Sequence, residues 1–183
     1  MLTKSVDVFW GYLEPEHDGG RGFAEPAGFG PALHASLGRR VNDRVGIAVK
    51  ADVQSSIDLG FVVGSGNDLS GALLLSVGTE LDLTVPGGPW VLSVGAGYAA
   101  LHLGGLNEGG DPCGPSVFVP CFDSPERGGS GGGWGYRVGL GWNADARKRL
   151  EGVLMELRTD GDWMEGGGEV RTRILQLGFR VLL

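Results

Sequence analysis

The chain has 183 residues, of which 36 are glycine; 42% are hydrophobic, 20% are charged, and the formal net charge is -7. So much glycine disfavours a helical bundle, because each glycine inside a helix costs about 1 kcal/mol relative to alanine. The acidic balance disfavours a nucleic-acid partner. No run of about 18 apolar residues exists, which excludes a membrane-spanning helix but not a membrane-spanning β-barrel. The length fits one domain over residues 1–183.

Apolar and polar residues alternate with a period of two along most of the chain, which predicts β-strands. The connections after the second, fourth and sixth strands are short, at 38–44, 84–89 and 144–148. Two long connections, 14–27 and 104–132, follow the first and fifth strands. This pattern predicts an all-β, eight-stranded antiparallel up-and-down barrel. We expect its strands at residues 5–13, 28–37, 45–63, 69–83, 90–103, 133–143, 149–159 and 169–183.

The two faces of the predicted strands differ in side-chain size. One face is large and apolar, whereas the other holds Gly, Ala and Ser with embedded charges, among them Asp7, Glu80 and Arg180. An eight-stranded barrel has room inside only for side chains. The small and charged face therefore suits the lumen and the apolar face suits lipid, the reverse of a soluble lipocalin-like barrel. We expect a lumen charge network formed by Lys50, Asp52, Arg137, Glu156 and Arg158.

Aromatic residues recur on the expected outward face. Trp90 and Tyr98 are eight residues apart on one strand, and Trp134 and Trp142 are eight apart on the next. At about 3.3 Å per residue and a tilt near 40°, eight residues rise about 20 Å, close to the apolar band of about 25 Å between the aromatic girdles of outer-membrane barrels. We therefore expect these four residues to form lipid-facing aromatic girdles.

The final strand alternates apolar residues up to the last position, at Leu175, Leu177, Phe179, Val181 and Leu183. With the eight strands, this pattern resembles the OmpA/OmpX-type family of small bacterial outer-membrane barrels, over the whole chain. The last residue is Leu here, where that family usually has Phe. The resemblance implies an outer-membrane location, periplasmic termini, short periplasmic turns and long extracellular loops.

Cys113 and Cys121 are eight positions apart in a segment rich in Pro and Gly. This spacing favours a small disulfide loop formed in an oxidising compartment over two reduced cysteines. No further Cys or His lies nearby, which disfavours zinc, and we expect no metal or cofactor. The N-terminus lacks the apolar core of a signal peptide, so the chain is either cytosolic or a mature form with an added initiator Met.

Two features bear on chemistry. His34 and Ser36 share one face of the second predicted strand, in a His-x-Ser motif. The outer-membrane lipid A deacylases have such a motif on a late strand, where it faces lipid. In this chain the alternation places the motif on the face that points into the barrel lumen. We therefore expect no catalytic residues. Arg171 and Arg173 precede the apolar run of the last strand, where their guanidinium groups suit lipopolysaccharide phosphates as well as an ordinary charged rim.

The leading hypothesis is a non-enzymatic outer-membrane anchor whose extracellular loops, notably 104–132, bind a partner protein or a surface. The alternatives are a narrow channel for small or apolar solutes, a lipid A-modifying enzyme, and a soluble lipocalin-like carrier.

Overall fold

The computed structural model describes residues 2–17, 28–58, 70–105, 129–163 and 168–183. These residues form eight β-strands, and no helix that could cross a membrane occurs in them. The strands are β1 (Leu2–His17), β2 (Gly28–Arg40), β3 (Val45–Asp58), β4 (Ser70–Thr84), β5 (Trp90–Gly105), β6 (Gly129–Asn143), β7 (Lys148–Trp163) and β8 (Gly168–Leu182).

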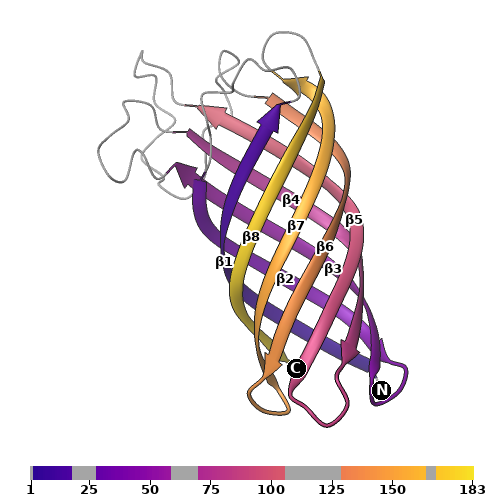
Figure 1. The fold of residues 1–183 in the computed structure, drawn as a ribbon. Helices are drawn as coiled ribbons and strands as arrows, with labels where there is room; N and C mark the ends of the chain where they lie inside the picture. Colours follow the sequence, from indigo (N-terminus) through magenta and orange to yellow (C-terminus); the bar gives the residue numbers. More distant parts are fainter. Residues whose placement is uncertain (1, 18–27, 59–69, 106–128, 164–167) are drawn as a thin grey trace.

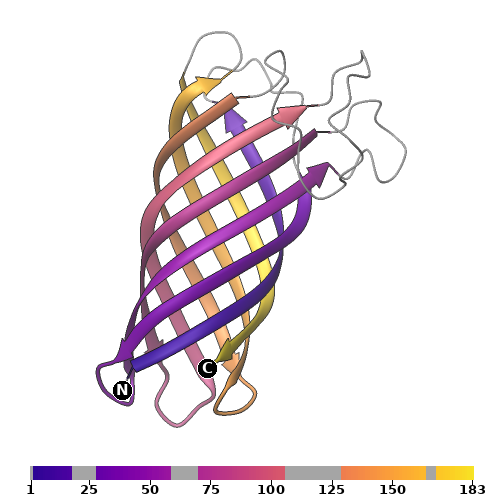
Figure 2. The ribbon, with the colours of Figure 1, turned by 180° about the vertical axis from the view of Figure 1, so that it is seen from behind.

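Each strand pairs antiparallel with its neighbours in the sequence, and β1 also pairs with β8, which closes the barrel. Figures 1 and 2 show the strands inclined to the barrel axis, with both chain ends beside the three tight turns at one end. The prediction of an all-β, eight-stranded antiparallel up-and-down barrel is confirmed.

The strands extend beyond the apolar stretches from which they were predicted. β1 continues to His17 instead of ending at residue 13, β6 begins at Gly129, and β7 runs to Trp163. The backbone ladder needs no apolar side chains, so Glu14 and Pro15 still pair with Arg173 and Thr172 of β8. Residues 59–63 of the strand expected at 45–63, Cys113, Cys121 and most of 104–132 lie outside the described residues.

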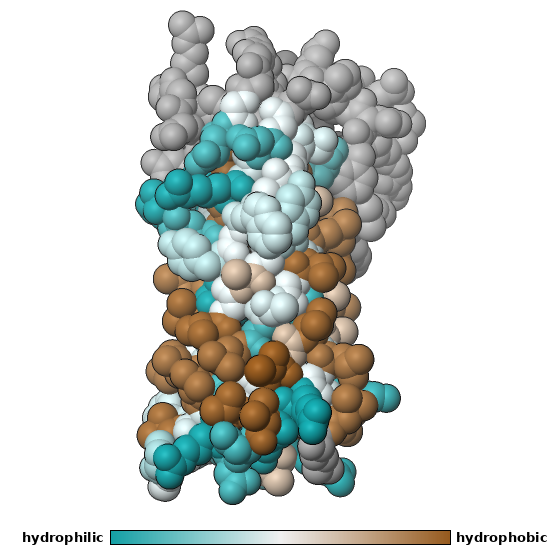
Figure 3. Space-filling view, turned by 90° about the vertical axis from the view of Figure 1, so that its right-hand side faces the viewer, coloured by the Kyte–Doolittle hydropathy of each residue, from teal (hydrophilic) through white to brown (hydrophobic). Residues whose placement is uncertain are grey.

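Alternation sorts the side chains into two environments. Large apolar residues lie on the outer face, where Leu177 and Phe179 are each 62% exposed. On the face shown in Figure 3 they form a hydrophobic band, with hydrophilic residues above it and at its lower end. Soluble monomers rarely expose so large a continuous apolar surface, which is typical of a surface that contacts lipid.

β7 corrects one prediction. Val153, Met155 and Leu157 are buried in the lumen, whereas Glu156 and Arg158 lie on the outer face, and Arg158 has a side-chain exposure of 62%. Glu156 and Arg158 therefore do not belong to the lumen charge network. Both faces of β7 carry large aliphatic residues, so alternation alone does not distinguish them. The register that the tight β6–β7 turn sets between the two strands assigns the faces of β7, because it pairs Glu156 with Tyr136 on the outer face.

Candidate functional site

A cluster of charged side chains, all of them buried except the half-buried Asp82, fills the part of the lumen nearest the termini. We call it the lumen plug; it consists of five carboxylates and four basic side chains: Asp7, Asp52, Glu80, Asp82, Glu151, Lys50, Arg137, Arg149 and Arg180. Every strand except β2 and β5 supplies at least one of them.

Arg180 on β8 is the centre of the lumen plug. Its Nε atom lies 3.2 Å from Asp7 Oδ2, and its Nη2 atom lies 2.8 Å from Glu80 Oε1. The same guanidinium reaches Asp82 Oδ2 at 3.1 Å and Glu151 Oε2 at 2.9 Å. One planar group with five donors thus connects β1, β4, β7 and β8 across the barrel, a task for which arginine is better suited than lysine.

Lys50 and Arg137 pair with further carboxylates of the lumen plug. Lys50 Nζ lies 2.8 Å from Glu80 Oε2, and Arg137 Nε lies 3.2 Å from the same oxygen. Arg137 Nη1 also lies 3.4 Å from Asp52, which accepts a 2.8 Å hydrogen bond from Ser76 Oγ. Buried charges persist only when they are paired in this way, because an isolated ion in a dry interior is strongly destabilising.

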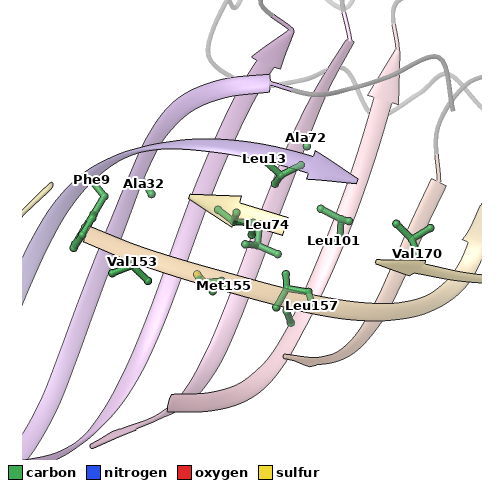
Figure 4. Packing of buried hydrophobic residues seen from close by; sticks show 12 residues of the cluster. Phe9, Leu13, Ala32, Ala72, Leu74, Leu101, Val153, Met155, Leu157 and Val170 are labelled. Carbon is green, nitrogen blue, oxygen red and sulfur yellow. The ribbon is translucent and has the colours of Figure 1, made fainter. Parts of the chain in front are cut away.

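Buried apolar side chains pack together inside the barrel (Figure 4). Several of them form an apolar layer farther from the termini than the lumen plug. Its members Leu13, Leu74, Leu157 and Ile174 each stand six residues along the strand from Asp7, Glu80, Glu151 and Arg180, respectively. Leu101 and Val170 add to the layer, and all six side chains are at most 2% exposed. The lumen is therefore closed twice, by ion pairs and by packed aliphatic side chains.

A small cavity lies in the lumen beside the lumen plug. A cavity of about 20 Å³ borders Lys50, Asp52, Ser76 and Arg137. A single water molecule needs about 10–15 Å³ of such space. This cavity therefore has room for an isolated water beside the lumen plug.

The predicted lumen residues are thus divided. Lys50, Asp52 and Arg137 lie in the lumen plug, together with Asp7, Glu80 and Arg180 from the same predicted face. Arg149, Glu151 and Asp82 complete it. The alternation on β7 predicts the opposite parity and therefore does not reveal Arg149 and Glu151. The sequence signal that could find them is this pair of charges directly after a tight turn.

Glu156 and Arg158 belong instead to a charged group on the outer face, which we call the outer rim: Glu156, Arg158, Arg171 and Arg173. Arg171 Nη2 donates to Glu156 Oε2 at 2.7 Å. Arg158 pairs in the backbone ladder with Trp134 on one side and Arg171 on the other. The outer rim lies on β7 and β8, beyond the apolar band and toward the end opposite the termini.

His34 and Ser36 have separate partners. His34 Nδ1 lies 3.4 Å from Asp52, and its ring stacks on Phe9 at a centroid distance of 4.4 Å. The Ser36 hydroxyl shares a 2.7 Å hydrogen bond with Ser5. His34 is buried and does not activate Ser36, so the pair has no arrangement for nucleophilic catalysis.

The four predicted girdle residues all lie exposed on the outer face. Trp90 pairs with Trp142 near the termini, and Tyr98 pairs with Trp134 toward the opposite end. The rings of Tyr98 and Trp134 pack edge to face at 5.7 Å. Gly132 makes room for this contact, since a Cβ atom there would collide with the Tyr98 hydroxyl.

No family model matches the chain, and no curated protein matches its sequence. Solved structures do match. Neisserial surface protein A is 14% identical with a TM-score of 0.69, over 97% of this chain and 96% of that one. Ail, the attachment invasion locus protein of Yersinia pestis, is 12% identical with a TM-score of 0.61, over 99% and 98% of the two chains.

The outer membrane protein OprG of Pseudomonas aeruginosa is 9% identical with a TM-score of 0.52, over 99% of this chain and 95% of that one. Ail has also been solved in complex with the heparin analogue sucrose octasulfate, and that structure matches with a TM-score of 0.56 at 12% identity, over 98% of this chain and 99% of that one. At these identities the similarity concerns the fold. The chain has the fold of the small eight-stranded outer-membrane barrels, as its resemblance to the OmpA/OmpX type implied.

Proposed function

We propose that the chain is a bacterial outer-membrane barrel that serves as a non-enzymatic anchor, with its termini in the periplasm and its long connections outside the cell. The observation that carries this proposal is the combination of a lumen sealed by ion pairs with an exposed apolar exterior. A barrel of this kind is stable in lipid, because the apolar face contacts acyl chains while the charges pair internally.

The lumen argues for an anchor over a channel. Conduction requires a continuous path with sites weak enough for a solute to leave. Here the charges of the lumen plug bind one another, and the apolar layer covers them. The anchor hypothesis therefore accounts for the described lumen without a conformational change that would open it.

The exterior argues against the remaining alternatives. A soluble carrier would place its charged groups on the outside and its apolar groups around the ligand, whereas Leu177 and Trp134 here are 62% and 68% exposed. A lipid A-modifying enzyme of the His-x-Ser kind needs the two side chains to act together on the lipid side. His34 is instead buried in the lumen, and Ser36 binds Ser5.

We infer the binding function from the segments that connect the strands at the end opposite the termini, notably within 104–132. Ail, of the same fold, binds a heparin analogue in one solved structure. The sequence of this chain favours a positively charged ligand instead of an anionic one. The segments 18–27, 59–69, 106–128 and 164–167 contain two arginines, Arg21 and Arg127, against the acidic residues Asp18, Glu25, Asp68, Glu108, Asp111, Asp123, Glu126 and Glu165. A partner with a basic surface complements them better than a polyanion does.

The outer rim supports a contact with lipopolysaccharide. The sequence predicts this role for Arg171 and Arg173, and Arg158 adds a third guanidinium beside Arg171. Guanidinium forks match phosphate oxygens in a bidentate manner. The outer rim lies next to Trp134, an aromatic residue of the kind found at membrane interfaces.

The proposal is tested in cells that express the chain fused to an export signal. We expect the barrel in the outer-membrane fraction, with residues 106–128 cut by external protease while the turns near the termini stay protected. Replacing 106–128 by a short Gly-Ser turn is expected to abolish capture of a biotinylated surface ligand and to leave the folded barrel unchanged. Replacing 164–167 in the same way is the control. Recovery of a detergent-free soluble monomer, or ion conductance of the purified barrel in bilayers, contradicts the anchor.

A further inference from the structure

The end of the barrel that carries the termini is basic. The described residues there include six exposed basic side chains, which we call the basic end: Lys4, Arg39, Arg40, Arg44, Arg147 and Lys148. Asp43 and Asp145 are the exposed acidic side chains among the same described residues. This end is therefore positive although the whole chain carries a formal charge of -7.

Two tight turns of the same design position part of the basic end. In the β2–β3 turn, Asn42 Oδ1 accepts the backbone N–H groups of Arg44 at 2.8 Å and Val45 at 2.9 Å. In the β6–β7 turn, Asp145 Oδ1 accepts those of Arg147 at 2.7 Å and Lys148 at 2.9 Å. Such Asx turns are rigid local structures, and each of them holds an arginine two residues after the Asx residue.

The carboxylate of Asp145 is occupied by the backbone. Its pKa lies below the ordinary value of 3.8, chiefly because the Arg147 N–H donates to it. The charges of Arg147 and Lys148 also stabilise this carboxylate, and both side chains are exposed to solvent. The basic end is available to an external anion.

The basic end lies next to one aromatic pair. Trp90 and Trp142 face each other across β5 and β6, and Asn143 N–H donates to the Pro89 carbonyl in the neighbouring turn at 2.8 Å. Trp142 also pairs with Leu150, two residues beyond Lys148 in the chain. Aromatic girdles mark the level of the lipid headgroups, so the basic side chains lie at or just beyond that level.

We propose that the basic end binds the anionic phospholipid headgroups of the periplasmic leaflet. Basic clusters beside a membrane are attracted to anionic lipids, and each Lys or Arg near the surface adds to the attraction. The headgroup phosphates complement the basic end in charge and lie at the same level, beside Trp90 and Trp142. This inference rests on the proposed orientation, in which the termini face the periplasm.

The experiment uses the full chain refolded into vesicles, with Trp10, Trp134 and Trp163 replaced by Phe so that Trp90 and Trp142 report on this end alone. The probes are spin-labelled phosphatidylglycerol and spin-labelled phosphatidylethanolamine at equal fractions in otherwise identical vesicles. We expect phosphatidylglycerol to quench the two tryptophans roughly two- to fivefold more effectively at low salt, with the preference lost at 1 M salt.

The Arg39→Gln, Arg40→Gln, Arg44→Gln and Arg147→Gln variant is expected to lose this preference. The matched control replaces Arg158, Arg171 and Arg173 by Gln at the outer rim and is expected to keep it. Equal quenching by both lipids in the folded parent protein, or an unchanged preference in the basic-end variant, overturns the proposal. The proposal is also overturned if the parent protein sediments with purified peptidoglycan in a salt-sensitive way, and the basic-end variant loses this sedimentation but keeps the lipid preference.

The two proposals fail separately. Protease protection of the turns in cells tests the orientation, whereas the vesicle assay tests lipid selectivity with no cell envelope present. Heat-modifiable electrophoretic mobility and circular dichroism show that each variant is folded before it is compared.

Discussion

Arg180 donates to Glu80 across the full width of the barrel, with 2.8 Å between Nη2 and Oε1. The two residues belong to β8 and β4, which are four strands apart on either path around the barrel. The bond therefore connects opposite walls, and Asp7 and Glu151 hold the same guanidinium from β1 and β7. This relationship makes the lumen plug a cross-brace as well as a seal.

Arg180→Met is expected to destabilise the barrel by about 3–5 kcal/mol, because the buried carboxylates of Asp7, Glu80 and Glu151 each lose the basic partner that they share. Urea unfolding in lipid vesicles measures the change. Arg180→Lys restores one charge with fewer donors and should recover part of the loss. A loss below about 1 kcal/mol for the Met variant would show that the cross-brace does not hold the walls together.

The corrected parity of β7 is tested by chemical accessibility. After folding in vesicles, Leu154→Cys should react with a lipid-soluble maleimide, because Leu154 is 56% exposed on the outer face. Met155→Cys should stay unreactive until the protein is unfolded, since Met155 is buried in the lumen. The reverse order of reactivity would restore the parity predicted from the alternation alone.

Gly178 and Gly152 offer a matched pair of alanine substitutions, because a Cβ atom would be crowded at the first and unobstructed at the second. A Cβ at Gly178 would collide with the Val8 carbonyl and lie 2.6 Å from the Phe9 ring. We expect Gly178→Ala to cost about 1–3 kcal/mol, as overpacking of an interior does. At Gly152 the nearest atom to a Cβ is Leu177 Cδ1 at 3.9 Å. Gly152→Ala should stay within about 0.5 kcal/mol of the parent, and equal effects at both positions would contradict the packing described.

The pH response of the β6–β7 turn follows from Asp145. Its pKa is lowered in the folded barrel, so its contribution to the turn is present above the ordinary value of 3.8 and is lost as the pH falls through the lowered folded pKa. Amide shifts of Arg147 and Lys148, followed by NMR in micelles, should titrate below pH 3.8. Asp145→Asn should abolish this titration and keep the turn, as Asn42 does in the β2–β3 turn. A midpoint above 3.8 would contradict the hydrogen bonds described.

The disulfide between Cys113 and Cys121 stays a prediction. Mass mapping of the protein purified without reductant is expected to find the two peptides joined, and thiol titration should detect free cysteines only after reduction. Reactive thiols in the unreduced outer-membrane protein would support the alternative of two reduced cysteines.

The period-two alternation by itself determined the strands, their number and, on seven of them, which face points inward. It succeeds there because small or charged residues contrast with large apolar ones, as on β3, where Lys50 and Asp52 alternate with Val49 and Val53. The physical reason is that a narrow lumen accepts small side chains and paired charges, whereas lipid accepts neither unpaired charges nor exposed backbone groups.

The tertiary structure decided what alternation leaves open. On β7 both Leu154 and Met155 are apolar, so the register with β6 and β8 assigned the faces. The tertiary structure also sets which lumen charges pair, because Arg180 comes within hydrogen-bond distance of Glu80 only when the barrel closes with its particular strand stagger. The same stagger set Leu13, Leu74, Leu157 and Ile174 at one level above the lumen plug. Residues that are distant in sequence meet through closure of the sheet, which no local pattern encodes.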